Sequence, residues 1–149
     1  MKVAIGADHA GYRLKEHIGA LLSDAGHEVV DLGTDSEAAV DYPDFAAAVG
    51  RAVVHGDADR GIVICGSGAG ASIAATKITG VRCATVHDVY TAHQAVEHDD
   101  MNVLALGARV IGVALAWEIV ETFLRARFDG AQRHRRRLAK VEALDRKRS

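Results

Sequence analysis

The sequence contains few cysteines, a single proline and no long apolar run. Its two cysteines, Cys65 and Cys83, both lie in hydrophobic, strand-like segments. They give no disulfide framework and suit a reducing compartment. No stretch approaches the roughly 18 apolar residues of a membrane span, and the first residues form a strand pattern rather than a signal peptide. We therefore expect a cytoplasmic protein that has no membrane partner.

The chain also has little net charge. The formal charge of -2 at pH 7 conceals an acidic region from Asp24 to Asp59 and a basic cluster from Arg133 to Arg137. This balance predicts no bulk binding of nucleic acid. A length of 149 residues, with 49% hydrophobic and 26% charged residues, is typical of one globular domain. We expect a single domain over 1–149, with 131–149 as a C-terminal basic helix and tail.

Strand-like and helix-like segments alternate along the chain. The expected strands are 2–6, 27–32, 62–65, 81–86 and 102–106. The expected helices are 12–25, a segment after Pro43, one beginning near Ala71, 89–98, 112–128 and 131–146. This alternation predicts an α/β fold, in which helices cover both faces of a parallel sheet. Ligands of such folds bind at the carboxyl ends of the strands. Candidate chemical groups should therefore follow strands directly.

The stretch from Gly61 to Lys77, GIVICGSGAGASIAATK, predicts a strand, a loop and a helix. Gly66, Gly68 and Gly70 let the backbone approach a ligand closely, and the following helix start offers unpaired N–H groups to an anion. Cys65 ends the strand at the same place, where the helix dipole stabilises negative charge. The stretch combines a base or nucleophile with an anion cradle.

Cys65 has a second interpretation, because a strand cysteine is more often a small buried hydrophobe. The glycine loop directly after Cys65 favours a chemical role. Cys83 lies in a strand pattern without such a loop. We interpret Cys83 as structural.

Two further candidates lie at the ends of predicted elements. Asp8 either caps the next helix, leaving His9 exposed, or bonds a substrate hydroxyl while His9 approaches an anion. Their position after a strand favours the second interpretation. His98 ends a helix, where a histidine is more often a dipole partner than a catalyst. Asp99 and Asp100 beside it could orient the ring for proton transfer.

The last predicted helix carries a candidate anion clamp. Arg133 and Arg137 are four residues apart, so they project from one helix face and could bind one phosphate. The alternative is a solvated charge run, which most such runs are. Leu138, Val141 and Leu144 form an apolar stripe that could dock this helix. The histidines show no metal-ligand spacing, so we expect no metal.

A competing motif overlaps the glycine loop. Gly66, Gly68 and Ala71 satisfy G-x-G-x-x-G/A, and Asp88 lies about 20 residues further on, as a dinucleotide-binding fingerprint requires. That fingerprint usually opens the first strand-helix-strand unit, whereas two strands precede it here. Cys65 would also have no role in a dinucleotide site. Dinucleotide binding remains an alternative.

The chain resembles the type B ribose-5-phosphate isomerases and the related galactose-6-phosphate isomerase subunits over nearly its whole length. The matching segments are GADHAG (6–11), DYP (41–43), ICGSGAGASIAATK (64–77), EHDDMNVLALGARVIG (97–112) and QRHRRR (132–137). The resemblance implies a Rossmann-like three-layer sandwich with a five-stranded parallel sheet, assembled as a homodimer or a tetramer of dimers. It also implies interconversion of ribose 5-phosphate and ribulose 5-phosphate with neither metal nor organic cofactor.

The same resemblance implies roles for individual residues. Cys65 would be the base that moves a proton between C1 and C2, His98 would help to open the furanose ring, and Ser67 would be catalytic. The implied substrate-binding residues are Asp8, His9, Tyr42, Gly66, Ser67, Gly68, Ala69, Gly70, Asp99, Arg109, Arg133 and Arg137. Of these, the two C-terminal arginines would bind the phosphate. His98, Asp99 and Arg109 would reach the site from the neighbouring subunit.

One departure from the family pattern concerns substrate choice. Many members have asparagine after the histidine, and this chain has Asp99. A carboxylate accepts hydrogen bonds from sugar hydroxyls but donates none, and it adds negative charge near a phosphorylated ligand. Another aldose phosphate is therefore an alternative substrate. The family also has a branch with a glutamate base in the loop, but Ser72 and Ile73 are uncharged, which places this chain with the cysteine branch.

Overall fold

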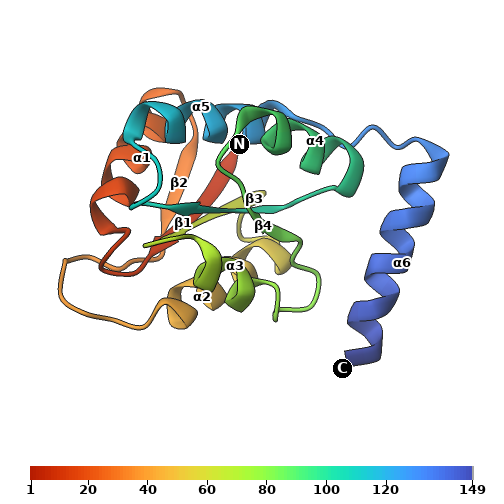
Figure 1. The fold of residues 1–149 in the computed structure, drawn as a ribbon, viewed down its shortest axis with the longest axis horizontal. Coiled ribbons are helices and arrows are strands. Elements are labelled where there is room, and N and C mark those ends of the chain that lie inside the picture. The colour runs from red at the N-terminus through yellow and green to blue at the C-terminus, as the bar shows by residue number, and fades with distance from the viewer. Residues whose placement is uncertain (149) are drawn as a thin grey trace.

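The computed structural model describes residues 1–148 as alternating strands and helices (Figure 1). In chain order the elements are β1 (Lys2–Ala7), α1 (Tyr12–Asp24), β2 (Glu28–Asp31), α2 (Tyr42–Val54), β3 (Arg60–Cys65), α3 (Ala69–Ala75), β4 (Cys83–Thr85), α4 (Val89–Asp99), β5 (Val103–Gly107), α5 (Val113–Arg125) and α6 (Gln132–Arg148). All strand pairs are parallel. The predicted α/β fold with a five-stranded parallel sheet is confirmed.

The sheet separates two hydrophobic clusters. On one face, Ile62 and Ile64 of β3 pack with residues of α1, α4 and α5. On the other face, Val63 and Cys65 pack with residues of α2 and α3. The alternation follows from the two-residue period of a strand, and burying each large aliphatic side chain contributes about 1.5–3 kcal/mol. Figure 1 shows the three layers, with α1, α4 and α5 above the sheet and α2 and α3 below it.

The strand order is β2-β1-β3-β5-β4. The chain passes from β1 to β2 on one side and then crosses to β3 on the other, so the order reverses between β1 and β3. Ala7 pairs with Ile64, and Cys65 pairs with Gly107. The carboxyl ends of β1, β3 and β5 therefore lie side by side at the place where such folds bind ligands.

Two of the differences from the predicted boundaries have a clear local cause. The fourth strand covers Cys83–Thr85 rather than 81–86, because it is an edge strand that pairs with β5 alone. The Val81 N–H is used in a turn, where it donates to the Ile78 carbonyl at 3.0 Å. Helix α3 begins at Ala69, two residues before Ala71, because Gly68 takes the left-handed conformation (φ 82°) and ends the loop. These shifts leave the order of elements unchanged.

Helix α6 stands apart from the sandwich (Figure 1). Its first turn meets α4 through the rings of His134 and His98, and its far end meets the turn before β4, where Asp145 accepts from the Gly80 N–H at 3.0 Å. Between these contacts lies a hollow of about 470 Å³, which Leu138, Val141 and Leu144 line from the α6 side. The predicted apolar stripe thus faces the body without filling this space. Within residues 1–148, no helix has the length and apolar character needed to span a bilayer.

Candidate active site

A pocket of about 340 Å³ lies where β1, β3 and β5 end. Its lining residues are Asp8, Tyr42, Cys65, Gly66, Ser67, Gly70, Arg109 and Val110. All but Val110 are candidates from the sequence. Local sequence explains part of this grouping, because each strand delivers its next residues to the same edge of the sheet.

The Cys65 sulfur is buried but borders this pocket. The residue is 4% exposed, and its Sγ accepts a hydrogen bond from the Gly68 N–H at 3.2 Å. Its carbonyl accepts from the Ala108 N–H at 2.9 Å, which ties the end of β3 to the end of β5. The sulfur is therefore fixed in position, with a backbone donor directed at it and open space beside it.

The glycine loop has no room to move towards β5. A Cβ added to Gly107 would lie 2.5 Å from the Ser67 carbonyl oxygen, and one added to Gly68 would lie 3.0 Å from the Leu106 carbonyl carbon. Thr85 also donates its hydroxyl to the Gly68 carbonyl at 2.9 Å. Such close backbone packing requires glycine, and it holds the loop in one conformation.

Two further pocket residues are held by specific contacts. The Asp8 Oδ1 accepts from the Gly11 N–H at 3.0 Å, so this carboxylate braces the turn before α1 and also lines the pocket. Both interpretations of Asp8, as a local brace and as a ligand group, are compatible with that position. The Tyr42 ring lies over Gly70, where an added Cβ would come within 2.8 Å of it.

Arg109 lies in the pocket of its own chain. A Cβ added to Gly66 would be 3.3 Å from the Arg109 Nη1, and the Arg109 N–H donates to the Gly66 carbonyl at 3.0 Å. The resemblance implied that this arginine comes from the neighbouring subunit. The structure differs because β5 pairs directly with β3, which brings the residue after β5 over the loop of the same chain.

His9 is not among the residues that line this pocket. Its Nδ1 accepts from the Val40 N–H at 3.2 Å, in the loop that leads to α2. Since a backbone N–H only donates, the Nδ1 carries no proton, and the proton of the neutral ring is on Nε2. That proton can be donated to an anion.

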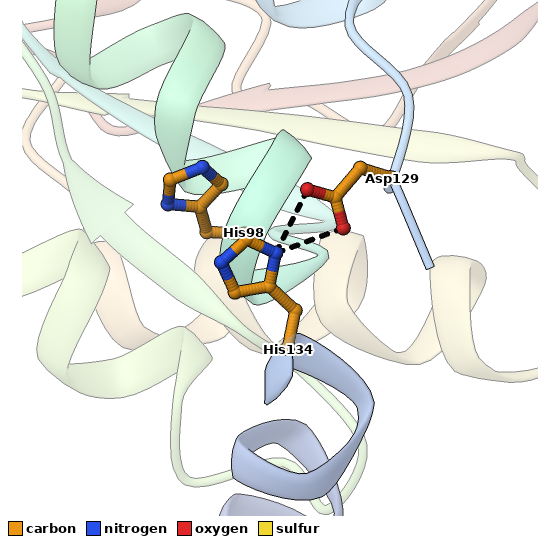
Figure 2. A group of neighbouring side chains, drawn as sticks. All are labelled: His98, Asp129 and His134. Atoms are coloured by element: carbon orange, nitrogen blue, oxygen red, sulfur yellow. Dashed lines mark hydrogen bonds and ion pairs between the residues drawn. The ribbon is translucent and has the colours of Figure 1, made fainter. Parts of the chain in front are cut away.

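The surroundings of His98 differ from the prediction. The ring of His98 stacks on His134, with centroids 4.0 Å apart and planes inclined by 25°. Figure 2 shows that His134 in turn faces Asp129. The expected orienting groups lie elsewhere: Asp100 ends α4 in a left-handed conformation and pairs with Arg82 at 3.1 Å, and Asp99 lines the α6 hollow.

Asp129 and His134 form a close pair. Both carboxylate oxygens lie 2.8 Å from the His134 Nδ1, and the His134 side chain is almost completely buried. The hydrogen bond from His134, followed by one from the Ala131 N–H, lowers the pKa of Asp129 from its ordinary value. Asp129 is therefore ionised near neutral pH.

His98, Asp129 and His134 are also the only group in residues 1–148 whose nitrogen and oxygen atoms cluster as metal ligands would, within 4.8 Å. Imidazole lone pairs lie in the ring planes, and stacked rings direct them side by side rather than towards one point. The carboxylate is already engaged by His134. This arrangement suits a hydrogen-bonded stack better than an ion.

Arg133 and Arg137 lie exposed on α6 and do not line the Cys65 pocket. Together with His98 and Asp99 they form what we call the outer group, whose members belong to α4 and α6. Apart from His9, the site residues predicted from the sequence thus fall into two sets in one chain. The pocket contains the cysteine and its loop, and the outer group contains the histidine and the two arginines.

The two cysteines have different surroundings. Burial raises the pKa of the Cys83 thiol to about 12, so Cys83 is a protonated thiol near neutral pH. It lines the α6 hollow and not the Cys65 pocket. These surroundings agree with its interpretation as a structural residue.

The topology weakens the dinucleotide alternative. In that fingerprint the acidic residue follows a strand that neighbours the glycine-rich strand. Here β5 lies between β3 and β4, so Asp88 is two strands away from the loop. Its carboxylate also serves as the N-cap of α4, accepting from the Thr91 N–H at 2.6 Å.

Sequence reasoning missed four residues that shape the two sets. Thr85 and Gly107 hold the loop, and Asp129 and His134 contact the His98 side. Gly107 ends a strand in the sequence, which is a weak signal for close backbone approach. The pairing of His134 with His98 has no local signal, because the two residues belong to different helices.

The sequence and the fold of this chain are similar to those of known proteins. The sequence profile of the Ribose/Galactose Isomerase family matches residues 3–141. The chain is 44% identical to ribose-5-phosphate isomerase B of Escherichia coli, over 99% of each sequence. It superposes on a structure of ribose-5-phosphate isomerase B from Clostridium thermocellum with a TM-score of 0.98 and 50% identity, covering 100% of both chains.

A third comparison involves a ligand complex. The structure of ribose-5-phosphate isomerase B from Mycoplasma genitalium with bound ribulose 5-phosphate matches with a TM-score of 0.91 and 41% identity. The match covers 97% of this chain and 96% of that one.

Proposed function

This chain belongs to the ribose/galactose isomerase family, and from that premise we propose that it interconverts ribose 5-phosphate and ribulose 5-phosphate through an enediolate. The observation that carries the proposal is the Cys65 sulfur, fixed by the Gly68 N–H at 3.2 Å and open to the pocket. A single base beside a rigid set of donors is what proton transfer between adjacent carbons requires.

The proposed chemistry uses the pocket residues. The Cys65 thiolate removes the C2 proton of the open-chain aldose, and the resulting thiol returns a proton to C1. Meanwhile O1 changes from a carbonyl to a hydroxyl oxygen and O2 changes from a hydroxyl to a carbonyl oxygen, which requires one proton to move from O2 to O1. The Ser67 hydroxyl, at the mouth of the loop, is our candidate for that exchange.

Backbone donors would stabilise the enediolate. Gly70 lines the pocket, and its N–H, in the first turn of α3, has no acceptor within the helix. Loss of one such donor typically costs about 2.7–4 kcal/mol of transition-state stabilisation. Arg109 adds a positive charge on the same side, and Asp8 can accept from a sugar hydroxyl.

The outer group would complete the site from a second copy of the chain. Opening the furanose ring breaks the C1–O4 bond, so the ring oxygen takes up a proton, whose donor we assign to His98, while the anomeric hydroxyl releases its proton to solvent. The phosphate needs cations, which we assign to Arg133 and Arg137. None of these residues lines the pocket of its own chain. In a symmetric dimer, α4 and α6 of each chain could carry these groups to the other pocket. The exposed side chains of Val141 and Leu144, 49% and 62% accessible, are apolar surface that such a partner would cover.

The direct test is conversion of ribose 5-phosphate to ketose, with ribulose 5-phosphate followed by NMR in D₂O. The proposed reaction predicts ketose formation and incorporation of deuterium at C1 of ribulose 5-phosphate. Binding without turnover or exchange would instead identify a sugar-phosphate binding protein. A rise in melting temperature with NAD, with no isomerisation, would favour the dinucleotide alternative.

A second candidate is isomerisation of another aldose phosphate. Asp99 favours it, because this carboxylate in the outer group stands where many family members have an amide. The test is ketose formation from a panel of pentose and hexose phosphates, assayed with the wild-type chain and with Asp99→Asn. It decides whether ribose 5-phosphate or another aldose phosphate is the preferred substrate. Preference for ribose 5-phosphate in both proteins contradicts the second candidate.

Mixing two inactive variants tests the shared site. Cys65→Ala damages the pocket and His98→Asn damages the outer group, so each homodimer should be inactive. After subunit exchange, half of the dimers are mixed, and each mixed dimer has one intact site, so about a quarter of all sites recover. No recovery in a verified mixed dimer would show that each site is built from one chain.

A further inference from the structure

We propose that Asp129 and His134 form a positioning pair that holds the His98 ring in the orientation needed for proton transfer to the furanose oxygen. The inference rests on the proposed function and extends it to two residues that do not themselves touch the substrate. Its basis is a chain of contacts from the loop before α6, through His134, to the face of His98 (Figure 2).

The first link fixes Asp129. Its N–H donates to the Glu97 carbonyl at 3.0 Å, one residue before His98 in α4. Its Oδ1 accepts from the Ala131 N–H at 2.9 Å. The carboxylate is therefore anchored to α4 and to the start of α6 at the same time.

The second link fixes the His134 ring. An ionised carboxylate cannot donate, so the His134 Nδ1 carries the proton that both Asp129 oxygens accept at 2.8 Å. This bond sets the ring orientation and its tautomer. His134 is 2% exposed and has no space in which to turn.

The third link is the stacking of the fixed His134 ring on the His98 ring. The two rings are 4.0 Å apart and nearly parallel, so His134 covers one face of His98 and limits its rotation. The His98 side chain is otherwise 33% exposed. Its Nε2 lies 3.8 Å from the Glu97 carboxylate, and Glu97 is in turn paired with His93. Without the His134 face, the His98 ring would be free to swing about its side-chain bonds.

The experiment separates ring opening from the later proton transfer. Ribose 5-phosphate closes into a furanose, and its conversion needs ring opening. Ribulose 5-phosphate cannot form the corresponding ring, because its C5 oxygen carries the phosphate. Deuterium incorporation at C1 of ribulose 5-phosphate therefore reports Cys65 chemistry without His98.

The variants are His134→Ala, which removes the stack and the bond to Asp129, and His134→Phe, which retains a flat ring but not the bond. Asp129→Asn keeps an acceptor and removes the charge. General acid catalysis contributes about 10²–10⁴-fold, and misplacing such a group loses a large part of it. We expect His134→Ala to lower kcat for ribose 5-phosphate about tenfold to hundredfold, with exchange from ribulose 5-phosphate within about twofold of wild type.

His134→Phe should recover part of the loss, because it restores the stack, and Asp129→Asn should show a smaller loss of the same selective kind. Inhibition by inorganic phosphate should be unchanged in all three, which shows that Arg133 and Arg137 are still in place. His17→Ala, an exposed histidine on α1, is the matched control and should alter neither assay.

Equal loss in both assays would overturn the inference and indicate a purely structural role, as would unchanged kcat in His134→Ala. Should His134→Ala fail to fold, His134→Phe and Asp129→Asn carry the same comparison. Failure of the proposed function looks different, because the wild-type chain itself would then neither convert ribose 5-phosphate nor exchange deuterium.

Discussion

The Cys65 pocket and the outer group are built by different means. The pocket is made mainly of backbone, with its loop packed against β5 so closely that added Cβ atoms on Gly68 and Gly107 would meet main-chain atoms. The outer group is made of side chains on α4 and α6, and its two arginines are exposed. One region is fixed by the sheet, and the other depends on how a single peripheral helix is held.

This difference separates two tasks of the proposed reaction. Stabilising an enediolate requires donors that do not move, which a loop locked between two strands provides. Opening a ring and holding a phosphate require groups that reach around a substrate, which long side chains provide. We expect damage to the pocket to abolish chemistry and damage to the outer group to weaken binding or ring opening.

Replacement of Cys65 by alanine should have the largest effect. Loss of the base should lower kcat about 10²–10⁴-fold, because general base catalysis contributes that much. Kinetics with ribose 5-phosphate measure the loss of kcat, and circular dichroism checks that the variant is folded. Cys83→Ala is the matched control and should retain near-native turnover, since Cys83 lies outside the pocket. Near-native turnover by Cys65→Ala would show that the Cys65 sulfur is not the base.

Substitution of Gly107 by alanine tests whether the loop must be rigid. Its Cβ would lie 2.5 Å from the Ser67 carbonyl oxygen, so the loop has to shift. A displacement of about 1 Å in a catalytic group can cost about 10²-fold in rate, and overpacking typically costs about 1–3 kcal/mol of stability. Kinetics and urea unfolding measure the two effects.

Gly19→Ala provides the control for Gly107→Ala. An added Cβ at Gly19 meets nothing within 4 Å, and the residue lies within α1. Alanine in a helix is favoured over glycine by up to about 1 kcal/mol, so this variant should be as stable as wild type or more so. Retention of full activity by Gly107→Ala would show that the loop tolerates movement.

The pocket was the more predictable region. The apolar run Ile62 to Ile64, the cysteine and the three glycines specify strand and loop locally, without reference to the rest of the fold. Topology supplied what the sequence lacked: β5, rather than β4, lies beside β3, and this neighbour brings Arg109 and Gly107 against the loop. Strand order depends on long-range packing, which local patterns do not encode.

The outer group was less predictable. The position of His98 at a helix end favours a dipole partner, its ring-opening role is implied by the family resemblance alone, and the aspartates beside it in the sequence are the predicted orienting groups. The ring instead meets His134, because α6 crosses α4 at that point. Neighbours in space from distant segments leave no periodic signal. The role of each outer residue, and its supply by a second subunit, stay predictions.

Substitution of Arg137 by alanine should have a moderate effect on binding. A hydrogen bond to a charged group is worth about 1.5–3 kcal/mol, so KM for ribose 5-phosphate should rise about tenfold or more with little change in kcat. Arg136→Ala is the matched control, because it removes the same charge from the neighbouring residue of α6, on another helix face. An equal rise in KM in both variants would contradict a specific phosphate clamp and indicate a general electrostatic attraction to the basic helix.

The smallest expected effect is a change in the pH dependence of the unfolding free energy. It arises from Asp129, which pairs with His134 beside the outer group. The hydrogen bond from His134 lowers the pKa of Asp129 below its ordinary value of 3.8. A carboxyl with a lowered folded-state pKa stabilises the fold fully above its unfolded pKa, and that contribution is lost as pH falls through the folded value. The gap in urea midpoint between wild type and Asp129→Asn should therefore be present at about pH 6 and shrink at about pH 3.5.

Asp88 sharpens this last test, because its pKa is also lowered, in this case by the Thr91 N–H at the start of α4. Asp88→Asn should produce a stability gap with the same pH dependence. It should leave conversion of ribose 5-phosphate unchanged, because Asp88 belongs to neither the pocket nor the outer group. Asp129→Asn should reduce that conversion as well. If the two variants behave alike in both measurements, Asp129 acts only as a helix-start brace, and the order of the outer group has another origin.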